Sequence, residues 1–384
     1  MKKIKNHRFH VIFWNIFQPI LTPWFRRKFN FTPEKIEADG PYLVLANHNT
    51  DWDPMLLACA LPRQTYFVAS EHIFRWGLVG RIIRFLVDPI ARMKGTTAGD
   101  TVLTVMRRLK AGANVAIFAE GNRSFNGLTG DILPSTGKLA RSCGATLVTY
   151  RMEGGYFASP RWCGKYTRRG KMTGKVMHVL TKEELKAMTV DGVNELIRAD
   201  LYEDAYATQR REMVPFKGKR LAEGLETVIC LCPKCGAMDT LHSRDDILSC
   251  DCGFQVKYNE YGFMEGADAP FDNITDWDVW QTDRLLSRIP EEGVIFSNDG
   301  VTLTEVLMGH EDKIIGRGTM TLYTDRLACC GETFELAHME GFALHGNRTV
   351  NMAYQGRDFE ISSEKLLCTR KYMQVINHLK EREA

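Results

Sequence analysis

The chain has 384 residues, of which 44% are hydrophobic, and this predicts two or three domains with a sizeable core. Its eleven cysteines are scattered apart from one dense group, a pattern that argues against an extracellular disulfide framework and favours a reducing cytoplasm. The net charge of +3 conceals a division: residues 1–220 contain 35 Lys and Arg against 19 Asp and Glu, whereas residues 221–384 contain 15 against 28. The basic part predicts an anionic partner, which is a membrane surface, a phosphorylated substrate or nucleic acid.

The chain begins with a basic stretch followed by an aromatic-rich apolar run over residues 9–25. No small-residue cleavage site follows this run, so we do not expect a secretory signal. The run contains two prolines and is shorter than the roughly 20 apolar residues needed to span a bilayer. We therefore expect residues 1–30 to form N-terminal helices that lie in the headgroup zone of a membrane. The alternative is an N-terminal helix packed on its own domain.

Between residues 41 and 180, short apolar β-rich runs alternate with segments of helical spacing. Strands are predicted over 41–48, 65–70, 88–93, 114–121, 145–153 and 175–180, and helices over 53–61, 74–86 and 96–112. A further helix is expected to begin at Thr181, because Glu184 completes a capping box. This alternation predicts an α/β domain over residues 31–212, with a mostly parallel sheet and flanking helices.

The stretch NHNTDWDP follows the first of these strands and contains a histidine and an aspartate five residues apart. His48 stands at the carboxyl end of the strand, where α/β sheets bind their ligands. The carboxylate of Asp53 would accept from one ring nitrogen and stabilise the imidazolium that forms when the other abstracts a proton. No serine or cysteine nucleophile is evident nearby, so the pair would activate a substrate hydroxyl. In the simpler alternative, Asp53 is only the N-cap of a helix with Pro54 at its first position.

A second polar loop, FAEGNRSFNG, follows the strand predicted at 114–121. An arginine can bind phosphate through two hydrogen bonds, and a glycine lets the backbone approach a ligand closely. Glu120, Gly121 and Arg123 therefore predict recognition of a polar headgroup. An ordinary turn with a surface arginine is the alternative.

In their order and spacing, the two loops resemble the glycerolipid acyltransferase family, of the 1-acylglycerol-3-phosphate acyltransferase type. The family's N-H-x4-D block is matched by Asn47, His48 and Asp53, and its F-P-E-G-T-R-S block by Phe118, Glu120, Gly121, Arg123 and Ser124. Ala119 and Asn122 replace the proline and the threonine of the second block. Arg92 ends the intervening strand, as in the family, and Lys138 stands one residue after the glycine of a K-x-G-x-x-x-L-A-like segment. The resemblance covers roughly residues 30–210.

The resemblance implies transfer of a fatty acyl group from acyl-CoA or acyl-carrier protein to the hydroxyl of a lysophospholipid, in phospholipid biosynthesis. It implies that His48 is the general base, that Asp53 orients it, and that the substrate is bound by Arg92, Glu120, Gly121, Arg123 and Lys138. It also implies a peripheral or monotopic protein on an anionic membrane surface, at the cytoplasmic side. The alternative function is that of a non-catalytic lipid-binding or scaffold protein that retains the fold.

After a predicted linker at residues 213–229, a cysteine cluster occupies residues 230–260. Its four central thiols, each pair followed by a glycine, resemble a zinc ribbon and predict a structural Zn2+ held by Cys232, Cys235, Cys250 and Cys252. Cys230 and His242 are alternative ligands. Two disulfides, or unliganded cysteines, are the alternatives to a metal.

Residues 261–384 predict a β-rich module, with strand signals from about 294 to 362 and a final helix. Strands followed by one helix resemble a pleckstrin-homology-like or GRAM-like fold. Trp277 and Trp280 are expected to pack in the core. The net charge of −13 over residues 221–384 has the wrong sign for phosphate contacts, so we expect no nucleic-acid partner there.

Overall fold

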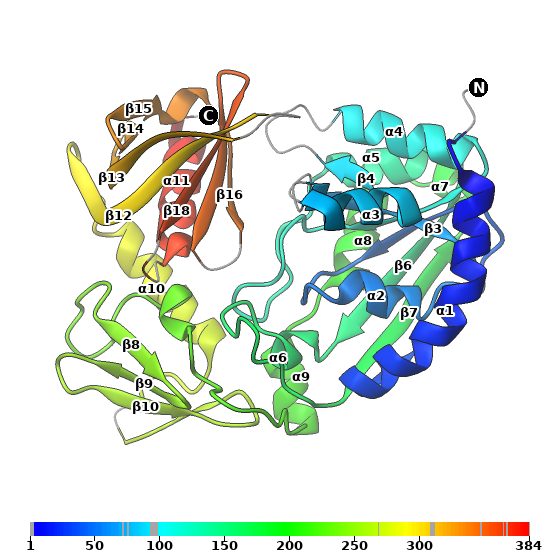
Figure 1. The fold of residues 1–384 in the computed structure, drawn as a ribbon. Coiled ribbons are helices and arrows are strands. Elements are labelled where there is room, and N and C mark those ends of the chain that lie inside the picture. The colour runs from blue at the N-terminus through cyan, green and yellow to red at the C-terminus, as the bar shows by residue number, and fades with distance from the viewer. Residues whose placement is uncertain are drawn as a thin grey trace. The chain divides into compact units, whose positions relative to one another are not determined.

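The computed structural model describes residues 4–70, 73–74, 77–92, 99–267, 269–307, 312–345, 348–363, 365 and 368–383. The chain forms two compact units, Met1–Pro160 with Thr167–Lys217, and Arg161–Tyr166 with Gly218–Ala384 (Figure 1). The first unit includes the predicted α/β domain. The short stretch 161–166, which the sequence pattern includes in that domain, belongs to the second unit.

The first unit contains a seven-stranded sheet in the order β1-β7-β6-β2-β5-β3-β4. Its strands are β1 (Phe31–Pro33), β2 (Tyr42–Ala46), β3 (Thr65–Ser70), β4 (Ile90–Arg92), β5 (Asn114–Phe118), β6 (Thr146–Glu153) and β7 (Met172–Leu180). Every neighbouring pair is parallel except β6 with β7. The predicted α/β fold with a mostly parallel sheet is confirmed, although β1 was not expected as a strand.

Helices connect these strands and cover the sheet. They are α1 (His7–Phe29), α2 (Asp53–Ala58), α3 (Gly77–Val87), α4 (Gly99–Lys110), α5 (Ser135–Ser142), α6 (Gly155–Ala158), α7 (Lys182–Ala187), α8 (Val190–Leu201) and α9 (Ala205–Glu212). Leu43 and Leu45 of β2 belong to one hydrophobic cluster with Ile197 of α8. Alternate residues of β2 point to the opposite face. They are equally buried, as expected for a parallel sheet that is covered on both sides. The capping box at Thr181 and Glu184 is confirmed.

Helix α1 buries His10, Phe25 and Phe29 and contains both prolines of the N-terminal run. It therefore packs on its own unit along one face. Its other side leaves large apolar side chains exposed, among them Ile12, Ile16, Phe17, Ile20, Leu21 and Trp24. Within the described ranges, no helix has both the length and the apolar character needed to cross a membrane.

The second unit combines two antiparallel sheets. The smaller has the order β11-β10-β9-β8, with β8 (Leu241–Arg244), β9 (Ile247–Cys250), β10 (Gln255–Tyr258) and β11 (Met264–Glu265). The larger has the order β15-β14-β13-β12-β18-β17-β16, with β12 (Val294–Val306), β13 (Lys313–Tyr323), β14 (Arg326–Cys329), β15 (Glu332–Glu335), β16 (Met339–His345), β17 (Thr349–Tyr354) and β18 (Arg357–Ser363). The helical elements are η2 (Leu225–Thr227), α10 (Ile274–Leu286), η3 (Leu336–His338) and α11 (Thr369–Glu383). The predicted β-rich region with a final helix is confirmed.

The segment 218–229 packs inside the second unit, although a linker was expected over 213–229. Its apolar residues are buried, namely Leu221, Ala222, Leu225, Val228 and Ile229. Trp277 of α10 is fully buried and donates its indole N–H to the carbonyl of Leu231 at 3.1 Å. Trp280 is partly buried against Phe271. The bond from Trp277 joins α10 to the start of the cysteine cluster.

Candidate active site

The two polar loops leave the same edge of the sheet. Ala46 at the end of β2 pairs with Phe118 at the end of β5. His48 lies two residues after Ala46, and Glu120 lies two residues after Phe118. The backbone N–H of His48 donates to Oε1 of Glu120 at 2.6 Å. The backbone N–H of Ser124 donates to the carbonyl oxygen of His48 at 2.9 Å. Motifs about seventy residues apart in the chain thus form one site.

His48 and Asp53 form a hydrogen-bonded pair, with 2.8 Å between Nδ1 and Oδ2. Asp53 is buried, whereas the His48 side chain is 20% exposed and its ring stacks on Phe118 with centroids 4.5 Å apart. An aspartate carboxylate only accepts, so Nδ1 must carry the proton and Nε2 holds the lone pair of the neutral ring. Within the described residues, Nε2 has no hydrogen-bond partner. The geometry suits a base that receives a proton at Nε2.

Asp53 does not cap α2 as the alternative interpretation of the sequence expected. The N-cap residue is Trp52, and Asp53 is the first residue of the helix. Its Oδ2 accepts from the backbone N–H groups of Asn49 at 2.6 Å and Thr50 at 2.9 Å, and its Oδ1 accepts from Thr50 Oγ1 at 2.7 Å. The carboxylate therefore faces the preceding loop and His48, rather than the first turn of the helix. Pro54 lies in that first turn, but as the second residue of the helix rather than the first.

Glu120 organises both loops through backbone hydrogen bonds. Besides holding His48, it accepts from the backbone N–H of Gly130 through Oε2 at 2.6 Å. Burial, with smaller contributions from the acidic groups of Glu203 and Asp53, raises the pKa of Glu120 to about 8. Both carboxyl oxygens of Glu120 therefore hold the backbone of the two loops in place.

Arg92 reaches the second loop from the end of β4. Gly121 has a φ of +71°, and a Cβ added to it would lie 2.1 Å from Nη1 of Arg92. The guanidinium therefore lies directly against the backbone at Gly121, which only glycine permits. Arg123, in the same loop, places Nε 3.2 Å from Oδ1 of Asp51. Two arginines thus lie at the loops that carry His48 and Glu120.

Lys138 is the one predicted catalytic or substrate-binding residue that the structure does not bring to these loops. It is exposed on α5, which packs against α7 and α8. No described residue forms a hydrogen bond or ion pair with its ammonium group. The structure therefore brings together His48, Asp53, Arg92, Glu120, Gly121 and Arg123, without Lys138.

Glu203, between α8 and α9, belongs to the site but was not predicted. Its Oε2 accepts from the side-chain amides of Asn47 at 3.1 Å and Asn49 at 2.6 Å, and its Oε1 accepts from the backbone N–H of Gly154 at 3.2 Å. Its side chain is buried, and this burial raises its pKa to about 8. No local pattern distinguishes Glu203 from Asp204 beside it, so its role required the tertiary structure.

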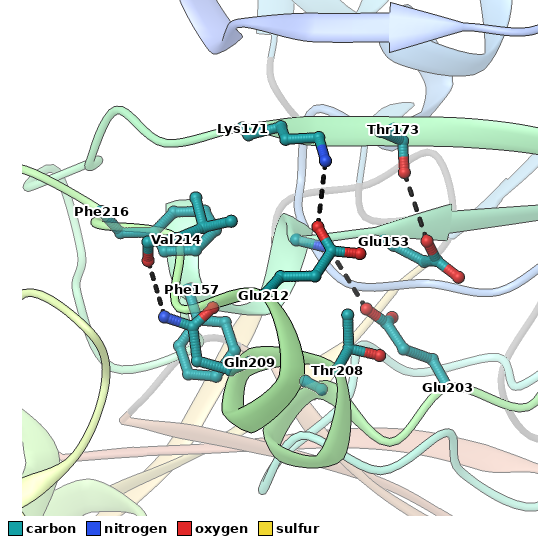
Figure 2. A pocket seen from close by; sticks show the side chains of 12 residues that line it. Glu153, Phe157, Lys171, Thr173, Glu203, Thr208, Gln209, Glu212, Val214 and Phe216 are labelled. Atoms are coloured by element: carbon teal, nitrogen blue, oxygen red, sulfur yellow. Dashed lines mark hydrogen bonds and ion pairs between the residues drawn. The ribbon is translucent and has the colours of Figure 1, made fainter.

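A cavity of about 20 Å³ lies beside Glu203, and Figure 2 shows the residues that line it. Glu212 forms an ion pair with Lys171 there, with 3.0 Å between the charged atoms. This volume holds about one water molecule and no lipid. His48 does not line the cavity. The cavity is therefore a small void beside Glu203 and its hydrogen-bond partner Gly154, and not a substrate pocket.

The four predicted zinc ligands converge in the second unit. The sulfur atoms of Cys232, Cys235, Cys250 and Cys252 all lie within 4.8 Å of one another. Cys232 and Cys252 are 3.8 Å apart, as are Cys235 and Cys250. Tetrahedral zinc with Zn–S bonds of about 2.3 Å has sulfur separations of about 3.8 Å, whereas a disulfide measures about 2.05 Å. The arrangement fits a metal ion and not two disulfides.

The alternative ligands lie outside this group. Cys230 donates its backbone N–H to Gln281 at 3.0 Å and is buried with α10. His242 is exposed and places Nε2 3.2 Å from Oδ1 of Asp251. The second unit therefore contains a closed set of four thiols, which is typical of structural rather than catalytic sites.

Part of the chain is similar to known proteins. Residues 28–153 match the family model described as Acyltransferase. Among solved structures, the chain is similar to the crystal structure of the 1-acyl-sn-glycerophosphate (LPA) acyltransferase, PlsC, from Thermotoga maritima. That match has 20% sequence identity and a TM-score of 0.40, and it covers 49% of this chain and 79% of the other. The region of residues 28–153 that matches the acyltransferase family model includes both polar loops.

Proposed function

We propose that the protein transfers a fatty acyl group from acyl-CoA or acyl-carrier protein to the hydroxyl of a lysophospholipid, with 1-acylglycerol-3-phosphate as the favoured acceptor. The observation that carries this proposal is the His48–Asp53 pair at the edge of the sheet, with Nδ1 bound at 2.8 Å and Nε2 directed away from Asp53. Such a pair activates a hydroxyl group. Its place within a region of the acyltransferase family supports an acyl acceptor as the substrate.

In the proposed reaction, the acceptor hydroxyl gives its proton to Nε2 of His48 as its oxygen attacks the thioester carbonyl carbon. Asp53 stabilises the imidazolium that forms. The C–S bond then breaks, the imidazolium returns the proton to the leaving sulfur, and the products are a phospholipid and a free thiol. No acyl-enzyme forms in this scheme.

The acceptor phosphate is proposed to bind Arg92 and Arg123. Arg92 ends β4 and its guanidinium lies against the loop of Glu120, and Arg123 belongs to that loop. Arginine binds phosphate with two parallel hydrogen bonds, so a pair of arginines suits a phosphomonoester. Glu120 and Gly121 shape the loop that presents these groups. Among the described residues, none forms a contact with the Lys138 ammonium group that supports the same role.

The first unit is proposed to dock on the cytoplasmic side of a membrane through α1 and α3. Phe9 of α1 and Phe85 of α3 have ring centroids 5.0 Å apart, so the two helices are neighbours. Exposed apolar side chains continue along both helices, namely Ile12, Ile16, Ile20 and Trp24 on α1 and Leu78, Val79 and Ile82 on α3. An apolar surface of this kind marks a membrane or protein contact. Aromatic and basic residues on α1 favour the membrane interface.

The cysteine cluster is proposed to hold a structural Zn2+ ion. Cys232, Cys235, Cys250 and Cys252 would supply four thiolates and leave no open position for a substrate. When bound, the ion would fix the loops that precede and follow β8 and β9. The chemistry of acyl transfer is assigned to the first unit alone.

Thiol release distinguishes this function from that of a non-catalytic lipid-binding or scaffold protein. The purified chain is mixed with acyl-CoA or acyl-carrier protein thioester and with several lysophospholipids, and free thiol and acylated lipid are measured. We expect acceptor-dependent thiol release that His48→Ala abolishes. No release with any donor and acceptor would favour the binding protein. The acceptor that reacts fastest identifies the headgroup.

A further inference from the structure

A groove of about 480 Å³ lies between the start of α1 and the end of α3. Its lining includes Lys5, His10, Arg81, Arg84, Phe85 and Asp88. Ligand sites commonly have volumes of about 300–1,000 Å³. The groove can therefore hold a group as large as a glycerophosphate.

The groove carries a net positive charge. Arg81 and Arg84 are three residues apart on α3, so their side chains share one face of the helix. Within the described ranges, neither arginine forms an ion pair, nor does Lys5 before α1. The acidic group of the lining, Asp88, has its charge compensated by Arg108 at 2.8 Å. Three cationic groups thus remain to attract an anion.

The floor of the groove is a fixed polar framework. His10 is only 3% exposed, with Nδ1 3.0 Å from the hydroxyl of Tyr66 and Nε2 3.2 Å from the carbonyl oxygen of Phe85. These bonds join α1, β3 and α3. The positions of the basic side chains around the groove therefore follow from the packed core of the first unit.

The groove lies at the edge of the sheet opposite the catalytic pair. Tyr66, beneath the groove, pairs with Val115 near the start of β5, whereas Glu120 follows the end of that strand. At about 3.3 Å per residue, the length of β5 beyond Val115 separates the two edges by roughly 10 Å. An anion in the groove is therefore not the acceptor whose hydroxyl reaches His48.

The surroundings of the groove identify its occupant. Phe85 lines the groove beside Arg81 and Arg84, is 57% exposed, and its ring centroid lies 5.0 Å from that of Phe9 on the apolar surface of α1. We propose that the groove binds the phosphate-bearing headgroup of an anionic membrane phospholipid, whose acyl chains contact the apolar surface beside it. A free phosphate would satisfy the cations but leave that surface in water. The proposal rests on the proposed membrane docking of α1 and α3.

Vesicle binding by the full chain tests this site. The variant Arg81→Gln/Arg84→Gln is compared with Lys182→Gln/Lys186→Gln, which removes the same charge from the exposed face of α7. Each is sedimented with vesicles of phosphatidylcholine alone or with added phosphatidylglycerol. We expect the arginine variant to bind anionic vesicles about tenfold more weakly than the parent. We expect the lysine variant to bind them as the parent does, and all three proteins to bind neutral vesicles equally.

If both variants lost the same amount of vesicle binding, the effect would be one of net charge and the proposed site would be wrong. Unchanged vesicle binding by the arginine variant would also contradict the site. Calorimetric titration with inorganic phosphate gives a further check. Phosphate binding that the arginine variant loses, together with unchanged vesicle binding, would assign the groove to a free anion. These readouts do not depend on acyl transfer. A chain that passes the vesicle test but releases no thiol would disprove the proposed reaction and leave the lipid site intact.

Discussion

Glu203 and Asn49 are 154 residues apart in the chain, yet the side-chain amide of Asn49 lies 2.6 Å from Oε2 of Glu203. The same oxygen accepts from Asn47, so both neighbours of His48 are held by one buried carboxyl group. Asp53 and Glu120 hold the backbone of the same loop. The position of the proposed base therefore depends on three acidic side chains, and Glu203 acts on it only through the two asparagines.

Removal of the Glu203 carboxyl group is expected to displace the His48 loop. Glu203→Ala leaves the amides of Asn47 and Asn49 without this acceptor, and a shift of the base by about 1 Å lowers kcat by about 100-fold. KM for the acceptor should change little, because Glu203 contacts neither arginine of the proposed phosphate site. Steady-state kinetics measure both constants. Glu212→Gln is the control, since Glu212 lines the same small cavity but pairs with Lys171. If Glu203→Ala keeps the kcat of the parent, Glu203 does not position the base.

Loss of the proposed base is expected to affect kcat most strongly. His48→Ala should lower kcat by about 100- to 10,000-fold, and Asp53→Asn by a similar factor because an amide favours the wrong tautomer of His48. The chain contains a matched control in His178, whose Nδ1 lies 2.8 Å from Oδ2 of Asp200 on another part of the sheet. His178→Ala should retain parental turnover. Equal losses for His48→Ala and His178→Ala would show a general effect on folding.

The stability of the first unit is expected to fall as the pH rises from about 4.5 to about 8. The pKa of Glu120 and that of Glu203 are raised from 4.5 to about 8 by burial, so the folded chain retains protons that the unfolded chain releases in this interval. The unfolded state then binds fewer protons, and the free energy of unfolding decreases with pH. The stabilisation from the protonated groups is complete below about 4.5 and is lost as the pH passes about 8.

Chemical denaturation across this pH interval measures the effect. Glu203→Gln and Glu120→Gln each remove one titrating group, so each variant should show a smaller decline than the parent. Glu184→Gln is a control of opposite sign, because hydrogen bonds from Thr181 lower the pKa of Glu184. A decline that is identical in parent and variants would exclude both buried carboxyl groups as its source.

The metal content of the second unit is expected to be about one zinc ion per chain by inductively coupled plasma mass spectrometry. Cys235→Ser and Cys252→Ser should lower the content, because each removes a thiolate of the tetrahedral set. Cys230→Ser and His242→Ala should keep it, since both residues lie outside that set. Well under one zinc per folded parent chain would contradict the site.

The final helix is expected to depend on a buried ion pair with the cysteine-rich module. Lys371 of α11 is fully buried, and its ammonium contacts the carboxylate of Asp239, which is 34% exposed. Asp239→Asn leaves a buried charge without its partner and should destabilise the unit by about 3 kcal/mol. Lys371→Met should destabilise the unit less than Asp239→Asn does. The double variant Lys371→Met/Asp239→Asn should be no less stable than Lys371→Met alone. Denaturation of the full chain, followed through the second unit, measures these differences. Additive losses would show that the two residues act independently.

Local patterns in the sequence predicted most of the elements and the chemistry that they carry. Strand β2 and strand β5 are continuous apolar runs, and such runs identify strands that are buried on both faces. The motifs at His48 and Glu120 each follow such a strand, and parallel strands end at one edge of a sheet. The cysteine spacing likewise predicted the four thiols that converge.

Only the tertiary structure decided which hydrogen-bond partners the buried polar groups have. Asp53 has the sequence position of a helix cap, yet its carboxylate turns to the loop of His48 because unpaired backbone N–H groups there need an acceptor. Glu203 meets Asn49 through the packing of segments 154 residues apart, and no local periodicity encodes such a contact. The segment 218–229 resembles a linker, but its apolar side chains are buried in the second unit. Periodicity and spacing are properties of neighbouring residues and can be predicted from sequence, whereas buried hydrogen bonds and the assignment of segments to a unit depend on how the whole chain packs.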